Sequence, residues 1–255
     1  MWDTIKKEKV RNSMKKLLFL FLCFYVFEHE EIAYAEKKVP ILVYHSIAEY
    51  NGHGSKELYV TPGNFEKQMA FLRDHGYTLL TFERWKEVDY VPKPIFITFD
   101  DGYKNNLNAY AIFQKLKTRH FKPMGTIFVI SDFIGRSNRL SNSDLKMMAD
   151  SGLFSIQSHT VTHPDLTKVE NVGYELKNSK EQVQKITGKP VIVLSYPYGN
   201  TNDKVISEVK KYYRFALTTT PEVFSPSGVK NELYLLPRIY VKYSTTLDEF
   251  INLVK

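Results

Sequence analysis

The stretch Pro94-Ile-Phe-Ile-Thr-Phe-Asp-Asp-Gly102 is a mostly apolar, β-rich run that ends abruptly in two adjacent carboxylates and a glycine. A strand buried on both faces of a parallel sheet produces such a continuous run, whereas a half-exposed strand alternates apolar and polar residues. Asp100 and Asp101 therefore follow a predicted strand at the point where it leaves the core. Carboxylates in that position indicate a site of chemistry, although an Asp-Asp-Gly turn alone would also end a strand.

A pair of histidines follows another predicted strand, in the stretch Phe154-Ser-Ile-Gln-Ser-His159-Thr-Val-Thr-His163-Pro164. His159 and His163 are four residues apart, and in isolation they would fit a capping or core role equally well. Together with one carboxylate, two imidazoles make a three-ligand metal site that leaves a coordination position open for water. The combination favours a catalytic metal centre.

Three segments together resemble the first motifs of a known family: Thr98 to Gly102, Ser158 to Pro164, and Ser195-Tyr-Pro-Tyr-Gly199. In this order they are similar to the motifs of the polysaccharide deacetylases, the NodB-homology or carbohydrate esterase family 4 enzymes. The resemblance extends from about Val39 to the C-terminal region. It implies a distorted (β/α) barrel that removes acetyl groups from N-acetylhexosamine polymers.

The resemblance also implies roles for individual residues. Asp101, His159 and His163 match the family's ligands for one divalent transition metal, with zinc expected first and cobalt, nickel or iron as alternatives. Asp100 matches its general base. In the segment Pro197-Tyr198-Gly199, the Tyr198 backbone N–H would face the developing oxyanion, and the alternative is a plain turn. No nucleotide loop or G-x-S-x-G elbow indicates another cofactor or a serine hydrolase.

Two departures from the family pattern point to one branch. Ser195 stands where the third motif usually begins with an arginine, and no histidine follows His163 to supply the usual C-terminal general acid. The segment Pro40-Ile-Leu-Val-Tyr-His45 resembles the Tyr-His segment of the poly-β-1,6-N-acetylglucosamine deacetylases. Leu236-Pro-Arg238-Ile-Tyr resembles theirs too, so Arg238 is the candidate to replace the missing arginine.

His45 is the predicted general acid, because the departing amine must be protonated and histidine is the side chain suited to this near neutral pH. A lone histidine at the end of a strand also fits a structural role. His53, in the following glycine-rich loop, is the alternative acid.

Length and patterning predict one α/β domain over residues 36–255. No Pro/Gly/Ser-rich linker divides the chain, and apolar strand-like runs alternate with helix-like periodic stretches. We expect a distorted (β/α) barrel with about seven parallel strands, whose C-terminal ends carry the active site. His45, Asp100, Asp101, His159 and Tyr198 each follow a predicted strand, so they should converge on one face.

Residues 1–35 are predicted to be a secretory signal. Basic residues precede the apolar run from Leu17 to Phe27, and Ala33-Tyr-Ala35 has the small-x-small pattern of a cleavage site. An uncleaved membrane anchor is the alternative, and it would be the only membrane contact. Cys23, the single cysteine, lies in this segment, so the mature protein has no disulfide. These features predict a secreted or envelope-associated protein.

The net charge of +7 raises the question of nucleic acid, but no RNA or DNA motif accompanies it. The expected partner is a polysaccharide, and the expected state is a monomer. The leading hypothesis is a metal-dependent hydrolase that releases acetate from a polymer of N-acetylglucosamine in an exopolysaccharide or cell wall. Two alternatives stay open: a non-catalytic glycan-binding relative, which Ser195 motivates, and a non-haem Fe(II) oxygenase, which also uses two histidines and a carboxylate.

Overall fold

The structure is a computed structural model of the 255-residue chain, and it describes residue 2 and residues 37–255. Apart from residue 2, the predicted signal segment lies outside the described residues. Residues 38–255 form one compact unit. Among the described residues, we find no helix with the length and apolar character needed to cross a bilayer.

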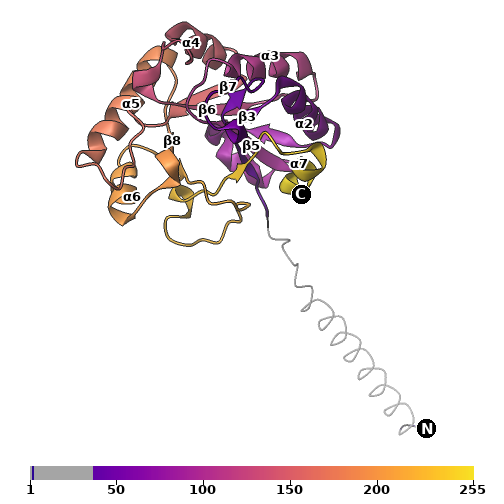
Figure 1. Ribbon diagram of the computed structural model, residues 1–255. Coiled ribbons are helices and arrows are strands. Elements are labelled where there is room, and N and C mark those ends of the chain that lie inside the picture. Colours follow the sequence, from indigo (N-terminus) through magenta and orange to yellow (C-terminus); the bar gives the residue numbers. More distant parts are fainter. Residues whose placement is uncertain (1, 3–36) are drawn as a thin grey trace. The chain divides into compact units, whose positions relative to one another are not determined.

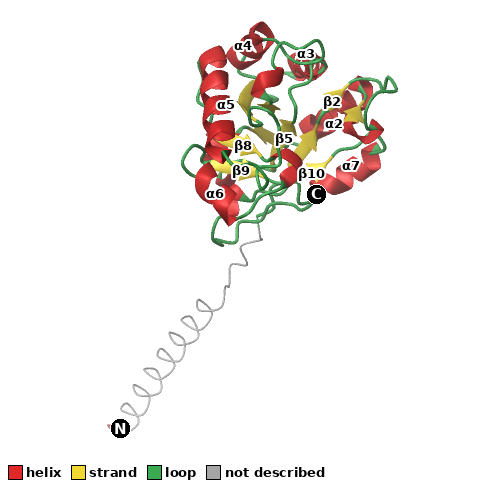
Figure 2. Ribbon diagram, turned by 60° about the vertical axis from the view of Figure 1, so that its left-hand side comes forward, coloured by secondary structure: helices red, strands yellow, loops and turns green. Residues whose placement is uncertain are grey.

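The centre of this unit is a curled sheet in which every strand pairing is parallel (Figures 1 and 2). Seven strands follow the order β10-β1-β5-β6-β7-β8-β9, and β4 pairs with the start of β5. The strands are β1 (Ile41–Tyr44), β4 (Thr78–Leu80), β5 (Pro94–Phe99), β6 (Gly125–Val129), β7 (Phe154–Ser158), β8 (Val193–Ser195), β9 (Phe215–Leu217) and β10 (Ile239–Tyr240). A separate parallel pair consists of β2 (Ser46–Ile47) and β3 (Tyr59–Val60). The predicted α/β architecture with seven parallel strands is confirmed.

Residues 236–240 connect the two edges of the curled sheet. Leu236 makes a parallel bridge to Leu217 in β9, and a few residues later β10 pairs with β1. In this segment only Ile239 and Tyr240 have strand geometry. Pro237 interrupts this segment, and proline cannot donate a ladder hydrogen bond. Residues 236–240, called the seam segment below, thus link β9 at one edge of the sheet to β1 near the other edge.

Helices surround the sheet (Figure 1). They are α2 (Pro62–Asp74), α3 (Asn106–Leu116), α4 (Asn142–Asp150), α5 (Val172–Thr187), α6 (Asp203–Val209) and α7 (Leu247–Val254), with short 3-10 helices η1 (Lys56–Leu58), η2 (Phe82–Asp89), η3 (Ser131–Phe133), η4 (Pro197–Gly199) and η5 (Glu232–Tyr234). Thr61 caps α2, with its side chain accepting from the Asn64 N–H. Trp85 lies in the kinked 3-10 helix η2, in which Arg84 departs from helical geometry.

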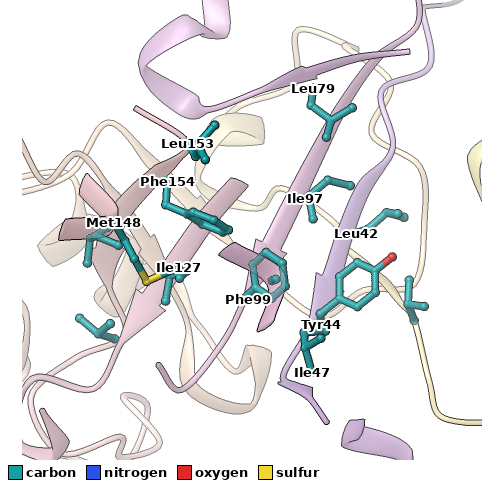
Figure 3. Packing of buried hydrophobic residues seen from close by; sticks show 14 of the residues in the cluster. Leu42, Tyr44, Ile47, Leu79, Ile97, Phe99, Ile127, Met148, Leu153 and Phe154 are labelled. Carbon is teal, nitrogen blue, oxygen red and sulfur yellow. The ribbon is translucent and has the colours of Figure 1, made fainter. Parts of the chain in front are cut away.

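The two faces of β5 explain its unbroken apolar sequence. Ile97 and Phe99 point into the larger core between sheet and helices (Figure 3), whereas Phe96 belongs to a second cluster. Because side chains alternate along a strand, Thr98 and Asp100 share the face of Phe96. Asp100 therefore faces the inside of the curled sheet, where the functional groups collect.

Candidate active site

Asp100 and Asp101 separate at the end of β5. Asp100 is only 3% exposed, and its backbone N–H still bonds to the Tyr44 carbonyl of β1, 2.9 Å away. Asp101 has a left-handed backbone, with φ of 68°. This turn directs the two neighbouring carboxylates to different places, so that they can perform different tasks.

Asp101, His159 and His163 form one compact group of metal-ligating atoms. One ligand atom from each lies within 4.8 Å of the others. The Asp101 Oδ1 atom is 3.6 Å from His159 Nε2 and 3.8 Å from His163 Nε2. Such a mixed carboxylate and imidazole set is typical of a divalent transition metal with an open position. The structure thus brings the three predicted ligands together.

The orientation of His159 suits metal binding. Its Nδ1 lies 2.8 Å from the Ser195 backbone carbonyl, which only accepts hydrogen bonds. Nδ1 must therefore carry the proton, and Nε2 presents its lone pair toward Asp101 and His163. This observation shows that the donor set fits a bound cation.

The loop between the two histidines is held in an unusual conformation. Thr160 and His163 both have left-handed backbone, with φ of 68° and 62°. The Thr160 hydroxyl accepts a hydrogen bond from the His163 N–H at 3.0 Å. Left-handed conformations cost energy for residues with a Cβ and persist where surrounding contacts impose them, commonly at functional sites.

Arg238 lies just before β10 and forms a buried ion pair with Asp100. Its Nη1 and Nη2 atoms donate to the two Asp100 oxygens at 2.7 Å each, and Nη2 also donates to Ser195 Oγ at 2.8 Å. Ser195 in turn donates to Asp100 Oδ2 at 3.2 Å. Arg238 is fully buried. The arginine absent from position 195 is thus supplied by the seam segment, and Ser195 connects the two charged groups.

This pairing sets the charge of Asp100. Burial alone would raise the pKa of Asp100, because a buried carboxylate loses hydration. The positive charge and hydrogen bonds of Arg238 oppose burial and prevail, so the pKa of Asp100 lies well below its usual value. His163 responds differently: burial, then the neighbouring His159, lowers its pKa to about 4. At neutral pH the site therefore combines an ionised Asp100 carboxylate with a neutral His163 imidazole.

His45 lies on the same face, partly buried, whereas His53 is exposed in the loop after β2. The His45 ring stacks on Tyr240 with 5.7 Å between ring centroids. Burial lowers the pKa of His45, while the carboxylates of Asp100 and Asp101 raise it in part.

Tyr240 was not predicted as a site residue. It lies two positions after Arg238, and strand alternation could have placed both on one face.

Pro197, Tyr198 and Gly199 form the short helix η4, directly after β8. Tyr198 has a φ of 60°, and its ring contacts that of His163 edge-on at 4.7 Å. A Cβ on Gly199 would lie only 2.2 Å from Thr219 Oγ1. The segment therefore has a tightly specified shape and borders the ligand group.

A pocket of about 560 Å³ lies next to the site, although none of the three candidate ligands lines it. Its lining includes Ser46, Glu49, Asn51, His53, Tyr103 and Asn138. Ser46 follows His45, and Tyr103 is close enough to Asp101 that, after burial, this carboxylate further raises the pKa of Tyr103. The pocket thus extends the site along the surface.

Comparisons with known proteins agree with this geometry. A family model described as polysaccharide deacetylase matches residues 87–214. A polysaccharide deacetylase from Bacillus cereus is 52% identical, with a TM-score of 0.85 over 86% of this chain and 70% of that one. The poly-β-1,6-N-acetyl-D-glucosamine N-deacetylase of Staphylococcus epidermidis is 28% identical over 89% of this chain and 86% of its own. The Streptococcus pyogenes deacetylase PplD, solved in complex with acetate, is 27% identical, with a TM-score of 0.76 over 86% of this chain and 98% of its own.

These matches span the strands that carry the ligand group, and they agree with an N-deacetylase rather than an oxygenase. The chain belongs to the polysaccharide deacetylase family.

Proposed function

We propose that this protein is a metal-dependent N-deacetylase that acts outside the cytoplasm on a polymer of N-acetylglucosamine. The observation that carries the proposal is the buried Asp100 carboxylate, which Arg238 keeps ionised beside a three-ligand group. Asp101, His159 and His163 would hold one divalent metal, with zinc the first candidate. Such a metal supplies Lewis acidity to the acetamide carbonyl and to the attacking water.

Asp100 is the proposed general base. Its carboxylate is ionised at neutral pH, and Oδ2 is 3.9 Å from His159 Nε2, which places it beside the ligands. It can therefore accept a proton from a water molecule at the site. Arg238 and Ser195 fix both carboxylate oxygens, so the base is oriented before substrate arrives. An oriented base costs no reorganisation when the proton moves.

His45 is the proposed acid for the departing amine. It follows β1, its ring stacks on Tyr240, and the charges of Asp100 and Asp101 reach it. Both carboxylates favour the protonated ring, which opposes the effect of burial. His53 lines the outer pocket instead, where a substrate contact suits it better than proton transfer. The Tyr198 backbone N–H is the proposed donor to the oxyanion.

The adjoining pocket supports a polymeric substrate. It is lined by amides, a carboxylate and tyrosines, which can hydrogen-bond to sugar hydroxyls and stack on sugar rings. A neighbouring sugar of the chain that carries the reacting acetamide would occupy it. The printed activity of the Staphylococcus epidermidis relative makes the β-1,6-linked polymer the first candidate.

Acetate release from defined glycans tests this function. The zinc-loaded protein would be incubated with β-1,6-linked and β-1,4-linked N-acetylglucosamine oligomers and with peptidoglycan, beside a chelator-treated sample and Asp100→Asn. We expect acetate from the β-1,6-linked oligomers with the loaded wild type alone. Glycan binding without acetate would favour a non-catalytic relative, and full activity after metal removal would contradict metal dependence.

A further inference from the structure

Glu175 is a buried acidic residue that the proposed chemistry does not use. It lies in the first turn of α5, twelve positions after His163, and is only 7% exposed. A carboxylate in the first turn of a helix is often explained by the helix dipole. The Glu175 carboxylate instead accepts hydrogen bonds from residues outside α5, so the helix dipole does not explain its position.

All the side-chain hydrogen bonds found for Glu175 in the described structure come from the loop between the two histidines. Oε2 accepts from the Val161 N–H at 2.8 Å and from the Thr162 N–H at 2.9 Å. Oε1 accepts from the Thr162 hydroxyl at 2.8 Å. Bonds from backbone donors to an ionised acceptor are stronger than bonds between neutral groups. Glu175 thus binds the middle of the loop that presents His163.

The bonded residues lie between the two strained positions of that loop. Thr160 and His163 have left-handed backbone on either side of Val161 and Thr162. A left-handed backbone is strained for a residue with a Cβ, so an unrestrained loop would relax toward other conformations. Relaxation would move His163 away from Asp101 and His159.

We propose that Glu175 is a positioning residue that holds His163 in its metal-binding geometry. It acts through the backbone of Val161 and Thr162 and does not touch the metal or the substrate. The inference rests on the proposed metal site. It predicts that loss of these hydrogen bonds weakens metal binding beyond any effect on folding.

Metal affinity and thermal stability, measured on the same variants, test this inference. Glu175→Ala should lower zinc affinity by about tenfold or more, in the range found for other outer partners of metal ligands, in competition with a chelator. Its cobalt-loaded form should show an altered visible spectrum. Glu175→Gln can accept from both N–H groups and donate to the Thr162 hydroxyl, so it should retain most of the affinity. Thr162→Val removes a single bond and should give a smaller loss.

Val183→Ala is the matched control. Val183 is buried on the same helix, and its apolar side chain cannot hydrogen-bond to the loop. It should lower the melting temperature without changing zinc affinity. Equal affinity in Glu175→Ala and Val183→Ala would overturn the inference while leaving the metal site intact. Equal losses in Glu175→Gln and Glu175→Ala would also overturn it, because charge rather than hydrogen bonding would then matter. If Glu175→Ala does not fold, Thr162→Val and Glu175→Gln decide the question. Wild-type protein without zinc affinity would overturn the proposed site and this inference together.

Discussion

Arg238 donates two parallel hydrogen bonds of 2.7 Å to the Asp100 carboxylate, although the two residues are 138 positions apart in the chain. Both side chains are buried, so neither charge is tolerable without the other. A buried pair of this kind is costly to break, because the remaining charge has no solvent to replace its partner. The Asp100 carboxylate therefore matters both for the stability of the fold and for the proposed proton transfer.

Replacement of Arg238 by Met should destabilise the protein by about 3–5 kcal/mol, because it leaves the Asp100 carboxylate buried and unpaired. The pKa of Asp100 should rise, since burial would no longer be opposed. Urea unfolding of both single variants and of Asp100→Asn/Arg238→Met measures the coupling. Additive effects in the double variant would show that the pair is not energetically coupled.

Asp100→Asn should retain the metal and lose turnover by roughly 10²–10⁴-fold, the usual contribution of a general base. Asparagine keeps the size of the side chain but cannot accept the proton. Metal content per chain and acetate release, measured on one preparation, check both parts. Loss of metal from this variant would mean that Asp100 is a ligand and that the two aspartates have exchanged roles.

His45→Ala should reduce turnover without changing metal content, because the ring is proposed to protonate the leaving amine and not to bind metal. His53→Ala is the matched comparison, since this exposed histidine lies in the adjoining pocket. It should alter KM more than kcat. A severe loss of kcat in His53→Ala alone would assign the acid to His53.

The metal-free protein should lose stability as the pH falls from 6.5 to about 4. His163 has a pKa of about 4 in the folded protein against an ordinary value of 6.5, so the unfolded chain binds more protons in this interval. The lowered pKa of His45 acts in the same direction. Melting temperatures of wild type and His163→Gln across this range test the prediction, with exposed His120→Gln as control. An unchanged slope in His163→Gln would contradict it.

Asn138→Ala should raise KM for longer oligomers by about three- to tenfold, the effect of one net hydrogen bond, while kcat is retained. Asn138 lines the adjoining pocket, where the neighbouring sugar is proposed to lie. Exposed Asn252 on α7 offers a control substitution to Ala. An equal KM for all oligomer lengths would remove the pocket from the substrate path.

Local pattern was sufficient to predict the elements that carry the site. The unbroken apolar run before Asp100 predicts a strand buried on both faces, and β5 is buried throughout. The spacing of His159 and His163 after β7 predicts a shared metal site, and their ligand atoms do lie together with Asp101. The strand and the meeting of these side chains could be predicted because burial periodicity and strand endings are properties of neighbouring residues. That the three side chains bind a metal stays a prediction.

Contacts between distant segments were decided only by the tertiary structure. Arg238 precedes β10, and its position depends on the register that sets Leu42 opposite Ile239 and Ile41 opposite Phe96. In the sequence it was singled out only by resemblance, and Glu175 was not singled out at all. The contact of Arg238 with Asp100 depends on strand register and on the seam segment between the sheet edges. The contact of Glu175 with the histidine loop depends on backbone turns of positive φ. Those features arise from packing of the whole chain, and no local periodicity encodes them.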